Sequence, residues 1–311
     1  MENKYNLGKL LVAILLLPIS FSGCGHGSGK SDSNDLYGVA ASGTQIAAVG
    51  LDGTILTSPD GISWTGQTSN TPNNLFGIVW SGTQFISVGF RGTIRTSPDG
   101  VAWTQQTSGS SKGLDGIAWS GTRFATVGEI GAILTSPDGV TWMPQTSGTS
   151  VDLLGIAWSG TQFVAVGLSG TILTSPDGVV WTAQTSGSTN HLSGIVWSGA
   201  KFAAVGLGGT IFTSPDGIVW ATQTSGTSTD LLGVAWSGTQ FAAVGLGGTI
   251  LTSSDGVTWT EQVSNSSNNL TGITWSSTQF IAVGLTGTSS GAQGTSPTIL
   301  TSPDGVTWTS R

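Results

Sequence analysis

The sequence predicts an all-β protein, a seven-bladed β-propeller with four antiparallel strands in each 39-residue blade. A unit of 39 residues recurs seven times within the 311-residue chain. Each unit holds four short apolar segments separated by turn signals, which is the content of one propeller blade. The composition agrees: 49 Gly and only 8% charged residues are accompanied by 13 Trp, which supply apolar area for packing between blades.

The seven units each begin at a leucine. These leucines are Leu36, Leu75, Leu114, Leu153, Leu192, Leu231 and Leu270. In the fourth unit we expect strands over residues 153–159, 162–167, 170–175 and 179–185, all too short for helices. We treat 36–311 as one domain, because a half-ring would leave blade faces unburied. A parallel β-helix is the alternative, although its coils are usually shorter and its end coils atypical.

The N-terminus carries the features of a secretory signal. Residues 1–23 contain Lys4 and Lys9, then a short apolar run, then small residues leading to Cys24. The Phe-Ser-Gly-Cys sequence at 21–24 resembles the lipobox of bacterial lipoproteins, which implies a diacylated Cys24, and the Gly that follows it implies the outer membrane. Residues 24–35 then form a flexible Gly/Ser tether. We expect a lipid-anchored protein of the bacterial cell envelope; the alternative is an incidental Cys after an ordinary signal.

The strongest local motif is Ser-Pro-Asp-Gly-x-x-Trp, first present at Ser58 to Trp64. Pro presets φ, Asp can hydrogen-bond back to the backbone, and Gly accepts a positive φ, so the motif predicts a tight turn. Its aspartates occur once per unit, and we expect them to be structural. They are Asp60, Asp99, Asp138, Asp177, Asp216, Asp255 and Asp304. The seven Trp that end the motif are assigned to outer strands, and six others to first strands.

This motif resembles the Asp-box of BNR-repeat propellers, a family that includes sialidases, sortilin-like receptors and photosystem II stability/assembly factors. The resemblance covers nearly the whole chain after the signal and implies the propeller fold. A sialidase-like glycoside hydrolase or lyase would need clustered Arg side chains and a Tyr–Glu pair. After the signal the chain has four Arg, one Tyr and two Glu. That set is insufficient, so we expect no catalytic residues and no enzyme activity.

The net charge further limits the classes of partner that we expect. Without residues 1–23 the chain has 7 basic against 15 acidic residues, a formal charge of minus 8. Nucleic acid is therefore not an expected partner, and membrane contact is expected through the lipid anchor alone. No spacing of Cys or His predicts a metal site, and we expect no cofactor.

The units differ mainly on one predicted face, where the second-to-third turns and the blade-to-blade connections meet. Recognition residues often lie on such loops, although surface drift would give the same variation. The patch across blades two and three is the main candidate. The candidate ligand-binding residues are Phe90, Arg91, Lys112, Asp115, Glu129 and His191. Blade seven has ten extra residues on this face, near 288–297.

The sequence therefore favours a non-enzymatic, lipid-anchored, monomeric propeller that binds an envelope protein or glycan in assembly or adhesion. A hydrolase or lyase is the first alternative, and a purely structural envelope protein is the second. The ring has one predicted weak seam, because Ala41 stands in blade one where the other first strands have Trp.

Overall fold

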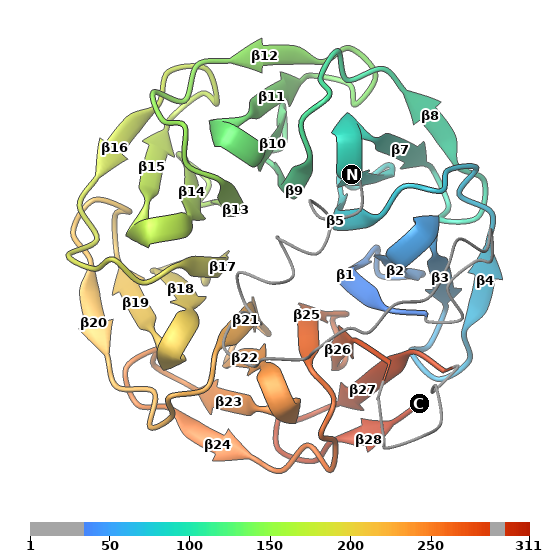
Figure 1. The fold of residues 1–311 in the computed structure, drawn as a ribbon. Coiled ribbons are helices and arrows are strands. Elements are labelled where there is room, and N and C mark those ends of the chain that lie inside the picture. The colour runs from blue at the N-terminus through green and yellow to red at the C-terminus, as the bar shows by residue number, and fades with distance from the viewer. Residues whose placement is uncertain (1–33, 287–295) are drawn as a thin grey trace, which may run out of the picture. The chain divides into compact units, whose positions relative to one another are not determined.

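The computed structural model describes residues 34–286 and 296–311, which form a closed ring of seven four-stranded sheets (Figure 1). In each sheet the strands lie in chain order and neighbouring strands are antiparallel. The predicted propeller is confirmed, and the parallel β-helix is wrong. The predicted signal peptide, Cys24, most of the tether and most of the addition near 288–297 lie outside the described residues.

The first strand of each blade lines the central opening. These strands are β1 (Leu36–Ala41), β5 (Leu75–Trp80), β9 (Leu114–Trp119), β13 (Leu153–Trp158), β17 (Leu192–Trp197), β21 (Leu231–Trp236) and β25 (Leu270–Trp275). The second strands follow as β2 (Ile46–Gly50), β6 (Phe85–Gly89), β10 (Phe124–Gly128), β14 (Phe163–Gly167), β18 (Phe202–Gly206), β22 (Phe241–Gly245) and β26 (Phe280–Gly284).

A three-residue 3₁₀ turn follows the second strand in the first six blades. These turns are η1 (Leu51–Gly53), η2 (Phe90–Gly92), η3 (Glu129–Gly131), η4 (Leu168–Gly170), η5 (Leu207–Gly209) and η6 (Leu246–Gly248). The third strands are β3 (Ile55–Ser58), β7 (Ile94–Ser97), β11 (Ile133–Ser136), β15 (Ile172–Ser175), β19 (Ile211–Ser214), β23 (Ile250–Ser253) and β27 (Thr298–Ser302). The outer strands are β4 (Thr65–Gln67), β8 (Thr104–Gln106), β12 (Met143–Gln145), β16 (Thr182–Gln184), β20 (Ala221–Gln223), β24 (Thr260–Gln262) and β28 (Thr309–Ser310).

The outer strands are shorter than predicted. In blade four the expected strand 179–185 is reduced to β16, and Trp181 precedes the strand instead of lying on it. The reason is that the N–H groups of Val179 and Val180 both donate to Asp177 Oδ1, so they are committed to the turn. The third strand also begins later than predicted, because Gly170 has a φ of 67° and belongs to the 3₁₀ turn.

The core lies between the blades. Each second strand is buried along its whole length, and its residues pack with those of the neighbouring blade. From blade two onward, the Phe that opens the second strand stacks on the Trp that ends the first strand; in blade four the ring centroids of Trp158 and Phe163 are 4.6 Å apart. Such a pair contributes about 0.5–1.5 kcal/mol beyond the area it buries.

The first strands approach one another closely at their third residue, which is glycine in every blade. A Cβ on Gly77 would lie 2.6 Å from the carbonyl oxygen of Asp115 in the next blade, and one on Gly272 would lie 2.7 Å from that of Tyr37. A side chain at this position would push neighbouring blades apart. The repeated glycine therefore sets the width of the central opening.

The ring closes without a shared blade. Blade seven packs directly against blade one, where Leu36, Val39 and Ile46 meet Ile281 and Val283. Hydrogen bonds cross the same seam as well. Among them, Thr271 Oγ1 donates to the carbonyl oxygen of Leu36 at 2.6 Å, and the N–H of Thr286 donates to Asp35 Oδ1 at 2.7 Å. Closure thus rests on side-chain packing and these cross-seam bonds.

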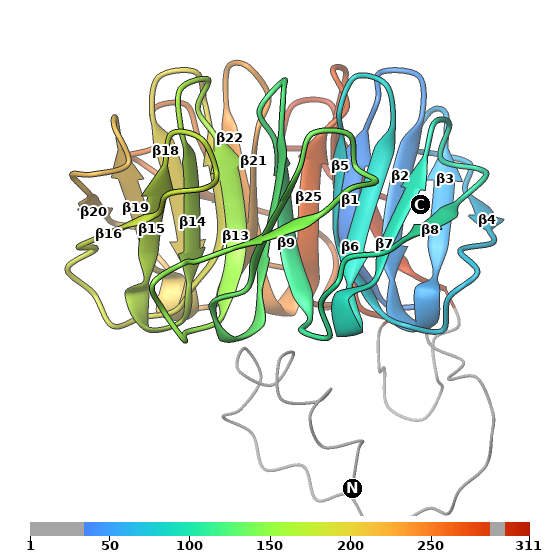
Figure 2. The ribbon, with the colours of Figure 1, turned by 90° about the horizontal axis from the view of Figure 1, so that it is seen from above.

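The antiparallel order gives the ring two chemically different faces. The turn face carries the first-to-second and third-to-fourth turns, and the loop face carries the 3₁₀ turns and the blade-to-blade connections (Figure 2). Among the described residues, no helix has the length and apolar character needed to span a membrane.

Candidate functional site

The Ser-Pro-Asp-Gly motif, which is replaced by Ser-Ser-Asp-Gly in blade six, forms the same turn in every blade. In blade three, Asp138 Oδ1 accepts the N–H groups of Val140 and Thr141, both at 2.8 Å, and the hydroxyl of Ser136 at 2.9 Å. Trp142 Nε1 donates to the carbonyl oxygen of Gly139 at 2.9 Å, which folds the indole over the turn. The backbone N–H groups of Thr141 and Val140 lower the pKa of the Asp138 carboxyl.

The other six aspartates of the motif make the equivalent bonds. They are Asp60, Asp99, Asp177, Asp216, Asp255 and Asp304. Each of these seven carboxylates is occupied with its own turn, and they are distributed one per blade around the ring. An arrangement of this kind does not converge on one substrate.

The turn face also presents a repeated apolar rim. The residue after the motif's Gly is an exposed aliphatic side chain in every blade. These residues are Ile62, Val101, Val140, Val179, Ile218, Val257 and Val306. Because the rim is the same in all blades, it does not single out one position as a site.

The four arginines lie apart. Arg91 is exposed at the tip of η2 on the loop face, and Arg123 follows a first-to-second turn on the turn face. Arg95 is only 4% exposed and donates through Nη2 to the carbonyl oxygen of Asn70 at 2.6 Å, while burial lowers the pKa of its guanidinium. Arg311 donates from Nε to Thr301 Oγ1 at 2.8 Å. These side chains do not form the cluster that a sialidase-like site requires.

The loop face is held together by a latch that repeats from blade to blade. The latch residue stands immediately before the first strand, and its side chain accepts the N–H at the tip of the preceding blade's second-to-third turn. In blade five, for example, His191 Nδ1 accepts the N–H of Ser169 at 2.8 Å. Six of the seven blades have a latch residue of this kind. They are Asp35, Asn74, Asp152, His191, Asp230 and Asn269.

Gly113 occupies the seventh latch position and has no side chain with which to accept. The turn that it faces is η2, whose tip residue Arg91 has a φ of 55° and packs near the start of β9. The Glu129 carboxylate accepts the N–H of Gly113 instead, and a Cβ at Gly113 would lie 2.9 Å from Glu129 Cδ. The seam between blades two and three therefore departs from the repeated pattern.

Charged and apolar side chains lie near Gly113 at this seam. The Arg91 guanidinium carbon lies 5.2 Å from the centroid of the Phe90 ring, and Lys112 Nζ donates to the carbonyl oxygen of Ile130 at 3.3 Å. Ile130 is 57% exposed with a φ of 52°, which is unusual for a β-branched residue. We name Phe90, Arg91, Lys112, Glu129 and Ile130 the loop-face patch.

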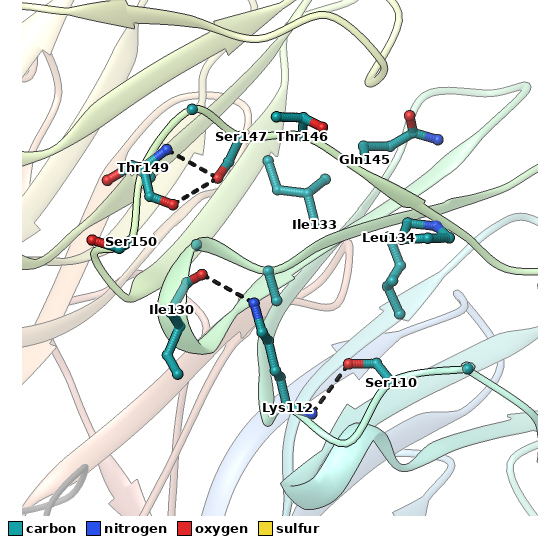
Figure 3. Close-up of a pocket in the computed structure, with 15 residues that line it drawn as sticks. Ser110, Lys112, Ile130, Ile133, Leu134, Gln145, Thr146, Ser147, Thr149 and Ser150 are labelled. Carbon is teal, nitrogen blue, oxygen red and sulfur yellow. Dashed lines mark hydrogen bonds between the residues drawn. The ribbon is translucent and has the colours of Figure 1, made fainter.

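The patch borders a groove of about 450 Å³ on blade three, between the connection that enters this blade and the connection that leaves it (Figure 3). Blades four and five carry grooves at the equivalent positions, but without Lys112 and Ile130. Lys112 and Ile130 stand at one side of this groove, while Ser147, Thr149 and Ser150 supply hydroxyl groups at the other. The groove thus combines an ammonium group, an aliphatic side chain and hydroxyls. This is the mixed lining expected of a surface that recognises a polar chain with apolar side groups.

The structure brings five of the six predicted binding residues to the seam between blades two and three and separates one, His191. Phe90, Arg91, Lys112 and Glu129 surround Gly113, whereas His191 is the latch residue two blades away. Asp115 lies on β9, at the position that Tyr37 and Phe76 occupy in β1 and β5.

Tyr37 and Phe76 form an aromatic pair at the inner end of the loop face, with centroids 5.6 Å apart. Burial raises the pKa of the Tyr37 phenol, with smaller contributions from the carboxylates of Asp35 and Asp52. This pair and Ile130 were not among the predicted site residues. The sequence carries no clear signal for them, because these two positions have no residue type that is shared across the seven units.

No group of three or more His, Cys, Asp or Glu side chains is arranged to hold a metal ion within residues 34–286 and 296–311.

Comparison with known proteins supports the fold. No protein-family model matches the chain, and no curated protein matches its sequence. Two solved structures are similar. One is described as YCF48 bound to D1 peptide: it is 19% identical, with a TM-score of 0.67 over 86% of this chain and 90% of that chain. The other is YCF48 from Cyanidioschyzon merolae, 18% identical, with a TM-score of 0.66 over 87% and 95%. At such identities the likeness establishes the propeller and leaves the function open.

Proposed function

We propose that this chain is a non-enzymatic, lipid-anchored envelope propeller that binds a protein partner through the loop-face patch. The observation that carries the proposal is the single break in the latch, at Gly113, surrounded by the residues of the patch. Repeated features explain the ring itself, so a local departure that exposes binding chemistry is the best candidate for function.

The side chains of the patch suit an extended peptide. Arg91 and Lys112 can bind carboxylates or backbone carbonyls, and Glu129 adds an acceptor. The exposed Ile130 supplies apolar contact in the groove, and Phe90 supplies apolar contact beside Arg91. One of the similar propellers is described as bound to a peptide, which supports a protein ligand over a glycan. Kinship with Asp-box propellers is part of the same proposal, supported by the turn geometry.

Catalysis is not part of the proposal. The seven turn aspartates are committed to backbone N–H groups on separate blades, and the arginines are dispersed over both faces and the interior. A glycoside hydrolase needs two carboxyl groups facing one bond, within about 5–10 Å of each other. We therefore favour the binding function over a glycoside hydrolase or lyase.

The test is an envelope pull-down and a glycan array with the full-length protein and two double variants. R91A/E129A removes one Arg and one Glu from the loop-face patch. R123A/E261A removes the same charges from the turn face and an outer strand, so it is the matched control. We expect a protein partner that the parent and the control retain and that R91A/E129A loses at least about tenfold in affinity.

Circular dichroism and melting temperature establish that both variants are folded before binding is compared. Equal retention by both variants would place the site elsewhere. If the protein binds a glycan on the array and retains no protein partner, the ligand is a carbohydrate and not a peptide. Failure to retain any ligand would leave the structural role as the better account.

A further inference from the structure

The seam between blades seven and one contains a pocket that the other seams fill. It has a volume of about 180 Å³ and opens on the turn face. Its wall from blade one includes Ala41, Ile46 and Asp60, and its wall from blade seven includes Ser277 and Gln279. This pocket lies on the face opposite the loop-face patch.

The other six blades place an aromatic pair at the corresponding positions. In each of them the Trp that ends the first strand stacks on the Phe that opens the second, with centroids 4.0–4.7 Å apart. Blade one keeps the register, because Ala41 pairs with Ile46 as Trp158 pairs with Phe163. The backbone is therefore the same, and the pocket occupies the volume of a missing indole.

The seam does not collapse to fill that volume. Gln279 Nε2 donates to the carbonyl oxygen of Asp60 at 2.7 Å, as Gln84 Nε2 does to that of Asp138 at 2.9 Å between blades two and three. The blades are thus held at their ordinary spacing while the side chains between them are smaller. Surrounding structure usually relaxes only in part after such a loss, and a well-held seam preserves the cavity.

The rim of the pocket is also distinctive. Ser277 has a φ of 75° at a position where the other blades have glycine, and its hydroxyl donates to the carbonyl oxygen of Ser276. Ser277, Thr278 and Asp60 are exposed and surround the opening. Ala41, Ile46 and Pro59 supply the apolar part of the lining, and polar residues supply the rest. Such a mixed lining suits an aromatic ring that is carried on a polar backbone.

We propose that this seam pocket binds an indole-sized aromatic side chain presented by a partner polypeptide. The other six seams indicate what fits this pocket, because a Trp side chain fills the equivalent position in each of them. The volume is also adequate, because an apolar protein cavity of roughly 150 Å³ takes up benzene. The exposed hydroxyls of Ser277 and Thr278 can then hydrogen-bond the partner's backbone.

The test is ligand-observed saturation-transfer NMR with the full-length protein and small probes. N-acetyl-tryptophanamide is the probe, and N-acetyl-leucinamide is its aliphatic control. We expect transfer to the indole protons of the first and little transfer to the second. Ala41→Trp fills the pocket and should abolish the transfer. Ala41→Leu fills it partly and should weaken binding about tenfold.

The matched control is Thr161→Trp, which adds an indole to an exposed turn of blade four on the same face. It should bind the probe like the parent. Melting temperatures show whether each variant is folded, and Ala41→Trp should raise the melting temperature because it removes a cavity. Equal transfer to both probes, or undiminished binding by a folded Ala41→Trp, would overturn the proposal.

A further probe distinguishes a partner's side chain from a free aromatic compound. The tripeptide Gly-Trp-Gly carries backbone on both sides of the ring, as a partner loop would, and it should bind at least as well as free indole. Binding of indole with exclusion of the tripeptide would overturn the polypeptide source.

Discussion

At the residue scale, the turn aspartates govern how the protein responds to acid. Backbone N–H groups hold the pKa of each of the seven carboxyls below its ordinary value. A carboxyl whose pKa is lower in the folded state contributes stability above its unfolded pKa of about 3.9. That contribution is lost as the pH falls through the folded value.

We therefore expect the urea midpoint to hold between pH 7 and pH 5 and to fall steeply below about pH 4. Chemical denaturation across this range measures it. The control is Asp138→Asn, which keeps an acceptor oxygen and loses the ionisation. It should be less stable than the parent at pH 7 and equal to it at pH 2. A midpoint that does not change with pH would contradict this account.

At the element scale, the latch joins each second-to-third turn to the next blade. Its partners are 22 residues apart in five blades, as with Ser169 and His191. The latch residue is an Asp, an Asn or a His, and these residue types share only the ability to accept a hydrogen bond. Because the residue types differ, the bond between His191 and Ser169 could not be predicted from the sequence; the ligand-binding role of His191 stays a prediction.

Replacing the latch residue separates acceptor chemistry from residue identity. His191→Asn places at this position the residue that Asn74 and Asn269 supply elsewhere, and it should retain the parent's stability. His191→Ala leaves the N–H of Ser169 without its partner and should cost about 0.5–1.5 kcal/mol of unfolding free energy. Urea denaturation measures both. Equal losses in the two variants would show that the imidazole itself is needed.

The same scale explains which parts of the fold could be predicted. The position of each strand follows from apolar alternation and from the Gly and Pro turn signals, so the blades could be identified directly. The length of the outer strand could not, because the Asp side chain takes two backbone N–H groups that would otherwise pair. For the site, the sequence predicts the charged residues of the patch. The role of Gly113 could not be predicted, because its missing side-chain acceptor is recognised only by comparison with the six latch bonds in the structure.

At the scale of the whole molecule, the ring is strongest where its seams are alike. The seam between blades seven and one lacks the aromatic pair and contains a pocket. We expect the amides of β1 to exchange faster than those of β9 or β13, because opening this seam exposes less apolar surface. Amide hydrogen exchange measures this. Equal protection in all three strands would contradict the idea of a weak seam.

Attachment to the membrane is a second property of the whole chain. We propose that Cys24 carries the lipid anchor, so Cys24→Ser should move the protein from the membrane fraction to the soluble fraction. Mass spectrometry of the N-terminal peptide checks the modification. An unmodified Cys24, or a membrane fraction unchanged by the substitution, would count against the anchor.

The central claim is that a protein partner binds the loop-face patch, and cross-linking in cells tests it most directly. A photoreactive residue replaces Lys112, beside the groove, or Lys201, whose ammonium donates to the carbonyl oxygen of Asp255 on the turn face. We predict a discrete cross-linked partner from position 112 and none from position 201. A partner captured from position 201 alone would contradict the claim.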